Sequence, residues 1–382
     1  MARSAYTRPS QPPPDFAAAT NLRQRARAAG MDPNHWYAVA TTAQLPPGSK
    51  RQVRFWRRDV AVFRGEDGAL GAVEDRCAHR QLPLTAGEVH GCRIVCAYHG
   101  WAHDAQGQVV DIPHETFGRK GLRFRVDSFE VRERYGLVWV FFGDRDRARD
   151  TPLPVIPELE GPDPWPCVPL EYRWEAHHSM VLDNVSDYTH GWLHRRLEPF
   201  RDPKLLAVEA DEHKVVVRYD TKIGAGKWMD PFIHRNALGS NTIELQYDYP
   251  YHRSDTDGHI KHFIAVLPED ERTTRAFFLL FYKQIRIPGT PWSVPRRLMK
   301  QVIRFGNRFI VDPVFAEDGA ALVLEQRAWE RHWDAPLAEL NPQVKAFQEL
   351  TIRKWEAWLA SQPGVSGSTP EGVRGDAAEE AG

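Results

Sequence analysis

The stretch that decides the fold is CAHRQLPLTAGEVHGCRIVCAYHGW, which runs from Cys77 to Trp101 and holds three of the four cysteines in the chain. It contains two short segments, Cys77-x-His79 and Cys96-x-x-His99, which are sixteen residues apart and pair one cysteine with one histidine each. Zinc accepts two thiolates and two imidazoles, but structural zinc loops usually pair like residues. One mixed pair per loop suits a [2Fe–2S] cluster in which two cysteines hold one iron and two histidines hold the other. The spacing therefore favours a cluster over a zinc site or a disulfide.

The residues around these four positions closely resemble the Rieske [2Fe–2S] motif in the large (alpha, oxygenase) subunits of Rieske non-haem iron oxygenases. The matching neighbours are Arg80, Leu84, Gly87, Gly100 and Trp101. Gln81 and Ala97 stand where the family more often has glycine and proline. The resemblance implies that Cys77, His79, Cys96 and His99 bind the cluster. We expect Cys92 and Cys167 to be ordinary buried thiols, and His90 to be a bystander.

Composition sets further limits. The 382 residues allow two domains, and 42% of them are hydrophobic. A net charge of −1 with no basic block gives no electrostatic argument for nucleic acid or an anionic membrane surface. No apolar run is long enough to span a membrane. Few cysteines favour a reducing, cytoplasmic location.

The chain divides into an all-β part and a mixed part. We expect disordered tails at 1–30 and 361–382, a Rieske domain at 31–150, a proline-rich linker at 151–166 and a catalytic domain at 167–360. Short apolar or alternating runs predict strands in the first part and a strand series from residue 214 in the second. Helical patterns begin near Ser179, Arg296 and Gln343. The fold class is therefore α+β, and the resemblance implies a helix-grip (START/Bet v 1-like) antiparallel sheet domain.

A second iron site is expected in LDNVSDYTHGWLHRR, residues 182–196. An oxygenase needs an iron with open positions, typically held by two histidines and one carboxylate. His190 and His194 are four apart and would share one face of a helix, and Asp187 lies on that face, placed to accept an imidazole N–H or to bridge to another site. The family's D-x-x-H-x-x-x-x-H signature has four residues between the histidines, whereas this chain has three and places Arg195 at the usual second-ligand position. His177 and His178 are also candidates for the second ligand.

The carboxylate ligand is expected far downstream. The family commonly has it in a context like F-x-x-D, which Phe315 and Asp318 match in VFAEDGAALVLEQ. Asp318 is therefore the predicted ligand, and Glu317 and Asp312 are the next candidates. An aspartate near a helix start is also a common cap.

The resemblance implies an oxygenase component that uses O2 to hydroxylate, demethylate or otherwise oxidise a hydrophobic molecule, aromatic or polycyclic in character. No strand–GxGxxG–helix unit occurs, so electrons should come indirectly from NAD(P)H through a separate reductase or ferredoxin. A homotrimer is implied, in which Asp187 helps to bridge the cluster of one subunit and the iron of the next. The start WYAVA at 36–40 is more similar to the monooxygenase and demethylase branch. Two other interpretations remain: an electron carrier with a degenerate second site, and a redox-sensing ligand-binding protein.

Overall fold

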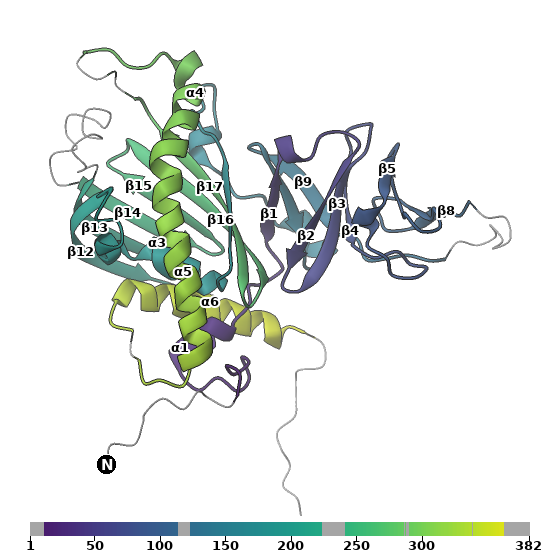
Figure 1. Ribbon diagram of the computed structural model, residues 1–382, viewed down its shortest axis with the longest axis horizontal. Coiled ribbons are helices and arrows are strands. Elements are labelled where there is room, and N and C mark those ends of the chain that lie inside the picture. Colours follow the sequence, from purple (N-terminus) through teal and green to yellow (C-terminus); the bar gives the residue numbers. More distant parts are fainter. Residues whose placement is uncertain are drawn as a thin grey trace, which may run out of the picture.

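A computed structural model describes residues 11–113, 123–223, 241–285, 287, 290–337 and 339–362. Figure 1 shows a β-rich part at one end and, beside it, a large sheet with helices across one face. The chain enters through a short helix, α1 (Leu22–Ala28), forms the β-rich part, and then builds the large sheet and its helices. This confirms the α+β class, with an N-terminal all-β part and a large antiparallel sheet.

The β-rich part contains three small antiparallel sheets. Their strand orders are β1-β10-β9, β2-β3-β4 and β5-β6-β7-β8. The strands are β1 (Trp36–Thr41), β2 (Ser49–Phe55), β3 (Arg58–Arg64), β4 (Leu70–Glu74), β5 (Glu88–His90), β6 (Arg93–Val95), β7 (Ala102–His103), β8 (Val109–Asp111), β9 (Glu130–Arg134) and β10 (Leu137–Phe141). Short helices accompany them: 3-10 turns Thr42–Gln44 and Leu84–Ala86, and α2 (Arg145–Asp150). The last of the three sheets carries both predicted cluster segments at its loops.

The large sheet has seven antiparallel strands in the order β11-β17-β16-β15-β14-β13-β12. They are β11 (Leu170–Trp174), β12 (Phe200–Ala210), β13 (Lys214–Ile223), β14 (Asn241–Asp248), β15 (Tyr251–Thr256), β16 (Ile260–Asp270) and β17 (Thr273–Tyr282). Alternation decides which face is buried: Val215, Val217 and Tyr219 are fully buried, as are Ile243 and Leu245 on the neighbouring strand. The same alternation places their polar neighbours on the opposite face.

Four helices follow or interrupt these strands: α3 (His178–Ser186), α4 (Arg296–Gly306), α5 (Asp312–His332) and α6 (Pro342–Ala360). A π-helical turn, Asn307–Val311, joins α4 to α5, so the two form one long helix across the sheet (Figure 1). Helix α3 packs against both α5 and α6, and the buried side chains of all three join the core under the sheet.

The two parts share an apolar contact. Trp36 and Trp139 of the β1-β10-β9 sheet pack in one cluster with Phe263, Phe277 and Phe281 of the large sheet. The predicted linker, residues 151–166, contributes Leu153 and Ile156 to the same cluster and contains a 3-10 turn, Pro157–Leu159. Burial of this many aromatic rings fixes how the two parts meet.

The prediction of a disordered tail over residues 1–30 is wrong for its last part. Helix α1 is capped by Asn21, and Ala26 and Ala29 pack with Ile352 and Trp355 of α6. Arg27 is also buried and forms an ion pair with Asp183 at 2.7 Å. The arginine- and alanine-rich composition suggested disorder. It could not reveal that this segment packs on α6 and pairs with Asp183. Residues 1–10 and 363–382 lie outside the described residues.

Candidate metal centres

The two predicted cluster segments fold as matching loops. The backbone N–H of Cys77 donates to the oxygen of Leu82, and that of Cys96 donates to the oxygen of Trp101, at 2.7 and 2.9 Å. In each loop the residue four after the cysteine donates back to the cysteine's carbonyl and has positive φ, +60° at Gln81 and +70° at Gly100. A glycine adopts this conformation without strain, which gives a physical reason for the family's preference at position 81.

The four predicted cluster residues lie together at the tips of these loops. Cys77 and Cys96 are 2% and 3% exposed, and the rings of His79 and His99 are 4.6 Å apart. Burial, with the Cys96 thiol beside it, raises the pKa of Cys77 to about 11. Thiols so buried become thiolates when a metal holds them. Two thiols and two imidazoles converging in this way fit a [2Fe–2S] cluster.

The bystanders are placed as follows. His90 is exposed and lies 3.0 Å from Glu88. The expectation that Cys92 is buried is wrong: it is exposed at the turn between β5 and β6, and Cys167 is half-buried. Cys92 lies in the tight turn of a hairpin, where the side chain points into solvent. Amino-acid composition alone does not reveal this position. Sequence reasoning also missed His103, which is fully buried beside the first loop, with its Nε2 3.4 Å from the Ala78 amide.

The predicted iron ligands also converge. The Nε2 atom of His194 lies 3.1 Å from Oδ1 of Asp318, and the Nε2 atom of His190 lies 3.6 Å from the same oxygen. One ligand atom from each of the three residues lies within 4.8 Å of the other two. His194 and Asp318 are buried and His190 is partly open. Two imidazoles and one carboxylate around one point form the ligand set of a non-haem iron with open positions.

The local structure of the histidines differs from the prediction. The helix that begins near Ser179 ends at Ser186, and a 3-10 segment, Tyr188–Trp192, follows it. Asp187 separates the two because its Oδ1 accepts the Thr189 N–H at 2.8 Å and caps the 3-10 segment. The amide of His194 then donates to the carbonyl of Gly191, three residues back. The histidines therefore meet across a tight turn, and the prediction of one continuous α-helix is wrong.

Asp318 is held by its neighbours in space. It lies in the second turn of α5, and Asn184 of α3 donates its Nδ2 to Oδ1 of Asp318 at 3.1 Å. The next residue, Gly319, lets α5 approach β11 closely, since a Cβ there would lie 2.4 Å from Nε1 of Trp174. Asn184 falls within the predicted iron-site segment, but only the structure shows its contact with the carboxylate.

Glu317 contacts the other side of His194. Its Oε2 lies 2.9 Å from Nδ1 of His194, whose Nε2 faces Asp318. Burial lowers the pKa of His194, but the hydrogen bonds and charges of Asp318 and Glu317 outweigh it and raise the pKa above the ordinary value. A carboxylate on the remote nitrogen is the usual means of orienting a metal-binding histidine.

Asp312, His177 and His178 have partners away from this site. Asp312 accepts the hydroxyl of Tyr172 at 2.5 Å. His177 bonds to Ser179, and Nε2 of His178 lies 2.7 Å from the carbonyl oxygen of Ala29. None of these three side chains belongs to the group of His190, His194 and Asp318.

Asp187 lies beside the site but does not offer its carboxylate to His190. Its oxygens take the Thr189 amide, the amide of Asn341 at 2.9 Å and that of Gln343 at 3.4 Å. The pKa of the His190 imidazole is lowered, because burial outweighs the nearby charges of Asp318 and Asp187. Within one chain, Asp187 joins the histidine turn to the start of α6.

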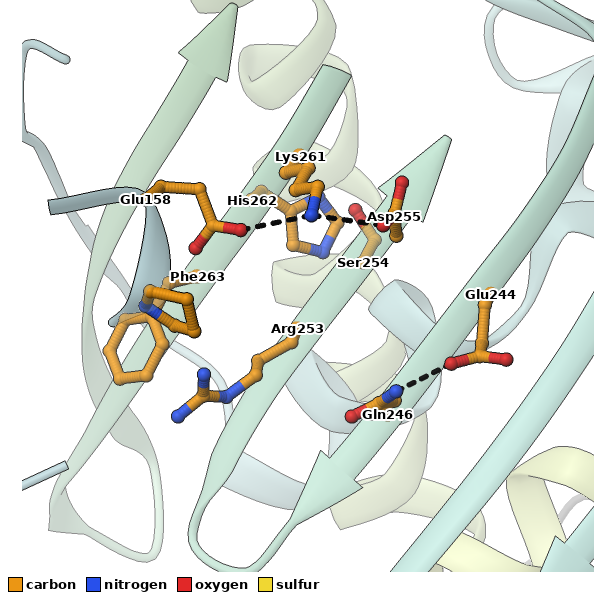
Figure 2. A pocket seen from close by; sticks show the side chains of 10 residues that line it. Glu158, Glu244, Gln246, Arg253, Ser254, Asp255, Lys261, His262 and Phe263 are labelled. Carbon is orange, nitrogen blue, oxygen red and sulfur yellow. Dashed lines mark hydrogen bonds and ion pairs between the residues drawn. The ribbon is translucent and has the colours of Figure 1, made fainter. Parts of the chain in front are cut away.

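Figure 2 shows a pocket over β14, β15 and β16, and none of the candidate metal-binding side chains lines it. Lys261 bridges Glu158 and Asp255 there at 3.1 and 3.0 Å. The charge of Lys261 is thus paired within the chain, and the pairing ties the linker turn to β15 and β16.

Comparison with known proteins agrees with this arrangement. Residues 35–129 match the Rieske [2Fe-2S] domain, and residues 174–362 match the vanillate O-demethylase oxygenase C-terminal domain. The 4beta-methylsterol monooxygenase of Methylococcus capsulatus is 44% identical over 341 residues, which cover 89% of this chain and 92% of that protein. The vanillate O-demethylase oxygenase subunit of a Pseudomonas strain is 31% identical over 161 residues, covering 41% of this chain and 43% of that subunit.

A solved structure shares the fold. Dicamba monooxygenase bound to 3,6-dichlorosalicylic acid superposes with a TM-score of 0.69 at 20% identity, over 87% of this chain and 100% of that one. A Rieske-type β domain joined to an antiparallel sheet with a two-histidine, one-carboxylate group defines an oxygenase component. The chain belongs to the Rieske non-haem iron oxygenases. It is an oxidoreductase that uses O2 and externally supplied electrons to oxidise its substrate. No helix in the described part of the chain has the length and apolar character that a bilayer crossing requires.

Proposed function

We propose that the substrate is a polycyclic, sterol-like molecule and that the reaction oxidises one of its methyl groups. The observation that carries this proposal is the 44% identity to a 4beta-methylsterol monooxygenase over 92% of that protein's length.

The experiment is a substrate comparison. Reconstituted holoenzyme with a reductase, NAD(P)H and O2 is given a 4-methylsterol or an aryl methyl ether of the vanillate type, and products are followed by mass. The proposal expects an oxidised sterol methyl and no turnover of the ether. Turnover of the ether alone would refute the sterol assignment and leave the oxygenase class intact.

The proposed ligand sets follow from the geometry above. Cys77, His79, Cys96 and His99 would hold the [2Fe–2S] cluster, and His190, His194 and Asp318 would hold the Fe(II). When bound, the mononuclear iron supplies activation of O2 at its open positions. The protein's part is to orient the imidazole of His194 through Glu317 and to hold the buried carboxylate of Asp318 away from water. The sheet and its helices would enclose the substrate as a helix-grip cavity.

Metal analysis tests the ligand sets. We expect about three irons per chain, two in the cluster and one mononuclear. About two irons, with the cluster colour intact, would instead support an electron carrier with a degenerate second site.

We further propose a homotrimer that receives electrons from NAD(P)H through a separate reductase or ferredoxin. In Figure 1 the loops between β5 and β8 lie at one end of the molecule, and α3 and α5 lie across the large sheet. Electron transfer weakens steeply with distance. We therefore propose that the mononuclear site receives its electron from the cluster of a neighbouring subunit and not from the cluster of its own chain. Asp187, beside His190, would then bridge to that cluster.

Mixing two inactive variants tests the assembly. A Cys96→Ser chain lacks the cluster and an Asp318→Asn chain lacks the mononuclear site. Co-assembly should restore activity that neither chain has alone, and no recovery in mixed oligomers would refute transfer between subunits. We also propose the domain division at residues 151–166 and a cytoplasmic location.

A further inference from the structure

Helix α4 (Arg296–Gly306) and the π-helical turn after it carry an unusual surface. Between residues 291 and 311 the sequence has five arginines and lysines and no aspartate or glutamate. Five of the fourteen large apolar side chains exposed in the described residues fall between 287 and 309. They are Ile287, Trp292, Leu298, Phe305 and Phe309. Cations and exposed apolar groups are thus concentrated on one short segment.

The helix sorts these residues into stripes. Met299, Ile303 and Asn307 are buried and face the core at a spacing of four. Leu298, Phe305 and Phe309 form an apolar stripe on the outer side, where the rings of Phe305 and Phe309 are 4.6 Å apart.

The cations form a second outer stripe beside the apolar one. Arg297, Lys300, Arg304 and Arg308 are exposed, and the guanidinium of Arg308 lies 5.9 Å from the ring centre of Phe309. No ion pair involving these four residues occurs within the described ranges, whereas Arg296 pairs with Asp163 at 2.8 Å. Four uncompensated positive charges lie beside an apolar ridge.

We propose that this face of α4 docks on an anionic lipid surface, with the apolar stripe at the acyl boundary and the cations on the headgroups. A helix with lysine and arginine beside phenylalanine, leucine and tryptophan has the composition of an interfacial helix. The net charge of −1 concealed this local cluster.

The same charges argue against a symmetric contact with a second copy. A two-fold contact of α4 with its equivalent would place the same cations against each other. In Figure 1, α4 projects past the sheet at an end away from the loops near β5 and β8. A lipid-bound molecule would therefore leave those loops open to an electron donor.

Vesicle flotation of the holoenzyme tests the proposal, without substrate or reductase, so that the result does not depend on the proposed chemistry. Vesicles of phosphatidylcholine are compared with vesicles that also contain phosphatidylglycerol. The wild-type protein should bind the anionic vesicles, and salt should release it. In Arg304→Gln/Arg308→Gln, each lost cation should lower the partition coefficient about fivefold. Phe305→Ser/Phe309→Ser should lose binding to the anionic vesicles.

Matched controls are available on other exposed segments. Arg147→Gln/Arg149→Gln on α2 and Leu337→Ser/Leu340→Ser before α6 remove the same kinds of group and should bind like the wild type. Cluster absorbance and thermal unfolding confirm that each variant is folded.

Three results would overturn the proposal. One is the absence of wild-type binding to anionic vesicles at low salt. Another is binding that the α4 variants do not alter. The third is dissociation of the oligomer by Phe305→Ser/Phe309→Ser, which would make this face a subunit contact.

Discussion

Glu317 provides a sharp test of how the iron site is built. Its Oε2 lies 2.9 Å from Nδ1 of His194, and the histidine is 1% exposed. Replacing Glu317 by glutamine keeps the size of the side chain and removes its charge. The amide keeps one acceptor for the imidazole N–H, so the ring should stay near its place but be oriented less strongly.

The expected size of the effect follows from this geometry. Loss of a partner that orients a metal-binding histidine typically lowers metal affinity about 10- to 100-fold, or about 1.4 to 2.7 kcal/mol. We expect Glu317→Gln in this range because the bond is short and the imidazole is shielded from water. Asp318→Asn, which removes a proposed ligand, should abolish mononuclear iron binding.

The assay is Fe(II) binding in competition with a chelator, with the visible spectrum of the cluster as the internal reference. Glu330 on the same helix is a matched control, since its side chain is 29% exposed against 28% for Glu317 and it pairs with Arg272 at 3.1 Å. Glu330→Gln should bind iron like the wild type. Unchanged iron affinity in Glu317→Gln would refute the orienting role.

Three other substitutions should have large effects. Gly87→Ala should lose the cluster absorbance, because the new Cβ would lie 1.9 Å from a backbone oxygen at the start of the second cluster loop. Gly319→Ala should lower mononuclear iron content and leave the cluster intact, since its Cβ would lie 2.4 Å from Nε1 of Trp174 and displace the helix that carries the carboxylate. Arg27→Met should destabilise the fold by about 3–5 kcal/mol in chemical denaturation, because Asp183 is left buried without its partner at 2.7 Å.

Each of these has a control. Gly306→Ala places a Cβ where nothing lies within 4 Å and should keep both metals. Gly91→Ala has the same open space but a φ of +58°, so it strains the turn without a clash and should keep the cluster. Adding Asp183→Asn to Arg27→Met should recover part of the lost stability. Equal destabilisation by the single and double variants would show that the charge pair is not the cause.

The meeting of Cys77, His79, Cys96 and His99 could be predicted because the geometry of the two loops is local. Each loop presents a cysteine and a histidine two or three residues apart, so the sequence spacing is nearly the spatial arrangement. The mononuclear site is different. Asp318 approaches His194 only through the packing of α5 on α3 and β11, and the supporting roles of Asn184 and Glu317 depend on that packing. Asp318 could be proposed from its F-x-x-D context, but the contacts of Asn184 and Glu317 left no pattern in the sequence.

Local chemistry also explains the wrong helix at the histidines. Apolar periodicity runs through residues 179–197 and favours one helix. Aspartate, however, competes for backbone amides and caps helices well. Asp187 ends α3 by taking the Thr189 amide. Asp187, a strong capping residue inside an otherwise helical pattern, was the sequence signal that the helix ends there.

The turn that follows Asp187 also explains how His190 and His194 can share a metal site although only three residues separate them, where the family has four. One residue fewer than in the family's signature changes the direction of the second ligand by about 100° in a regular α-helix. Here the backbone bonds after Asp187 span three residues, as in Leu193 to His190 at 2.9 Å, so the shorter segment still directs both Nε2 atoms at one oxygen of Asp318. Arg195 stays outside, exposed and with its guanidinium 5.4 Å from the ring centre of Trp192. With the shorter spacing, the turn after Asp187 therefore still brings both imidazoles and the carboxylate of Asp318 to one point.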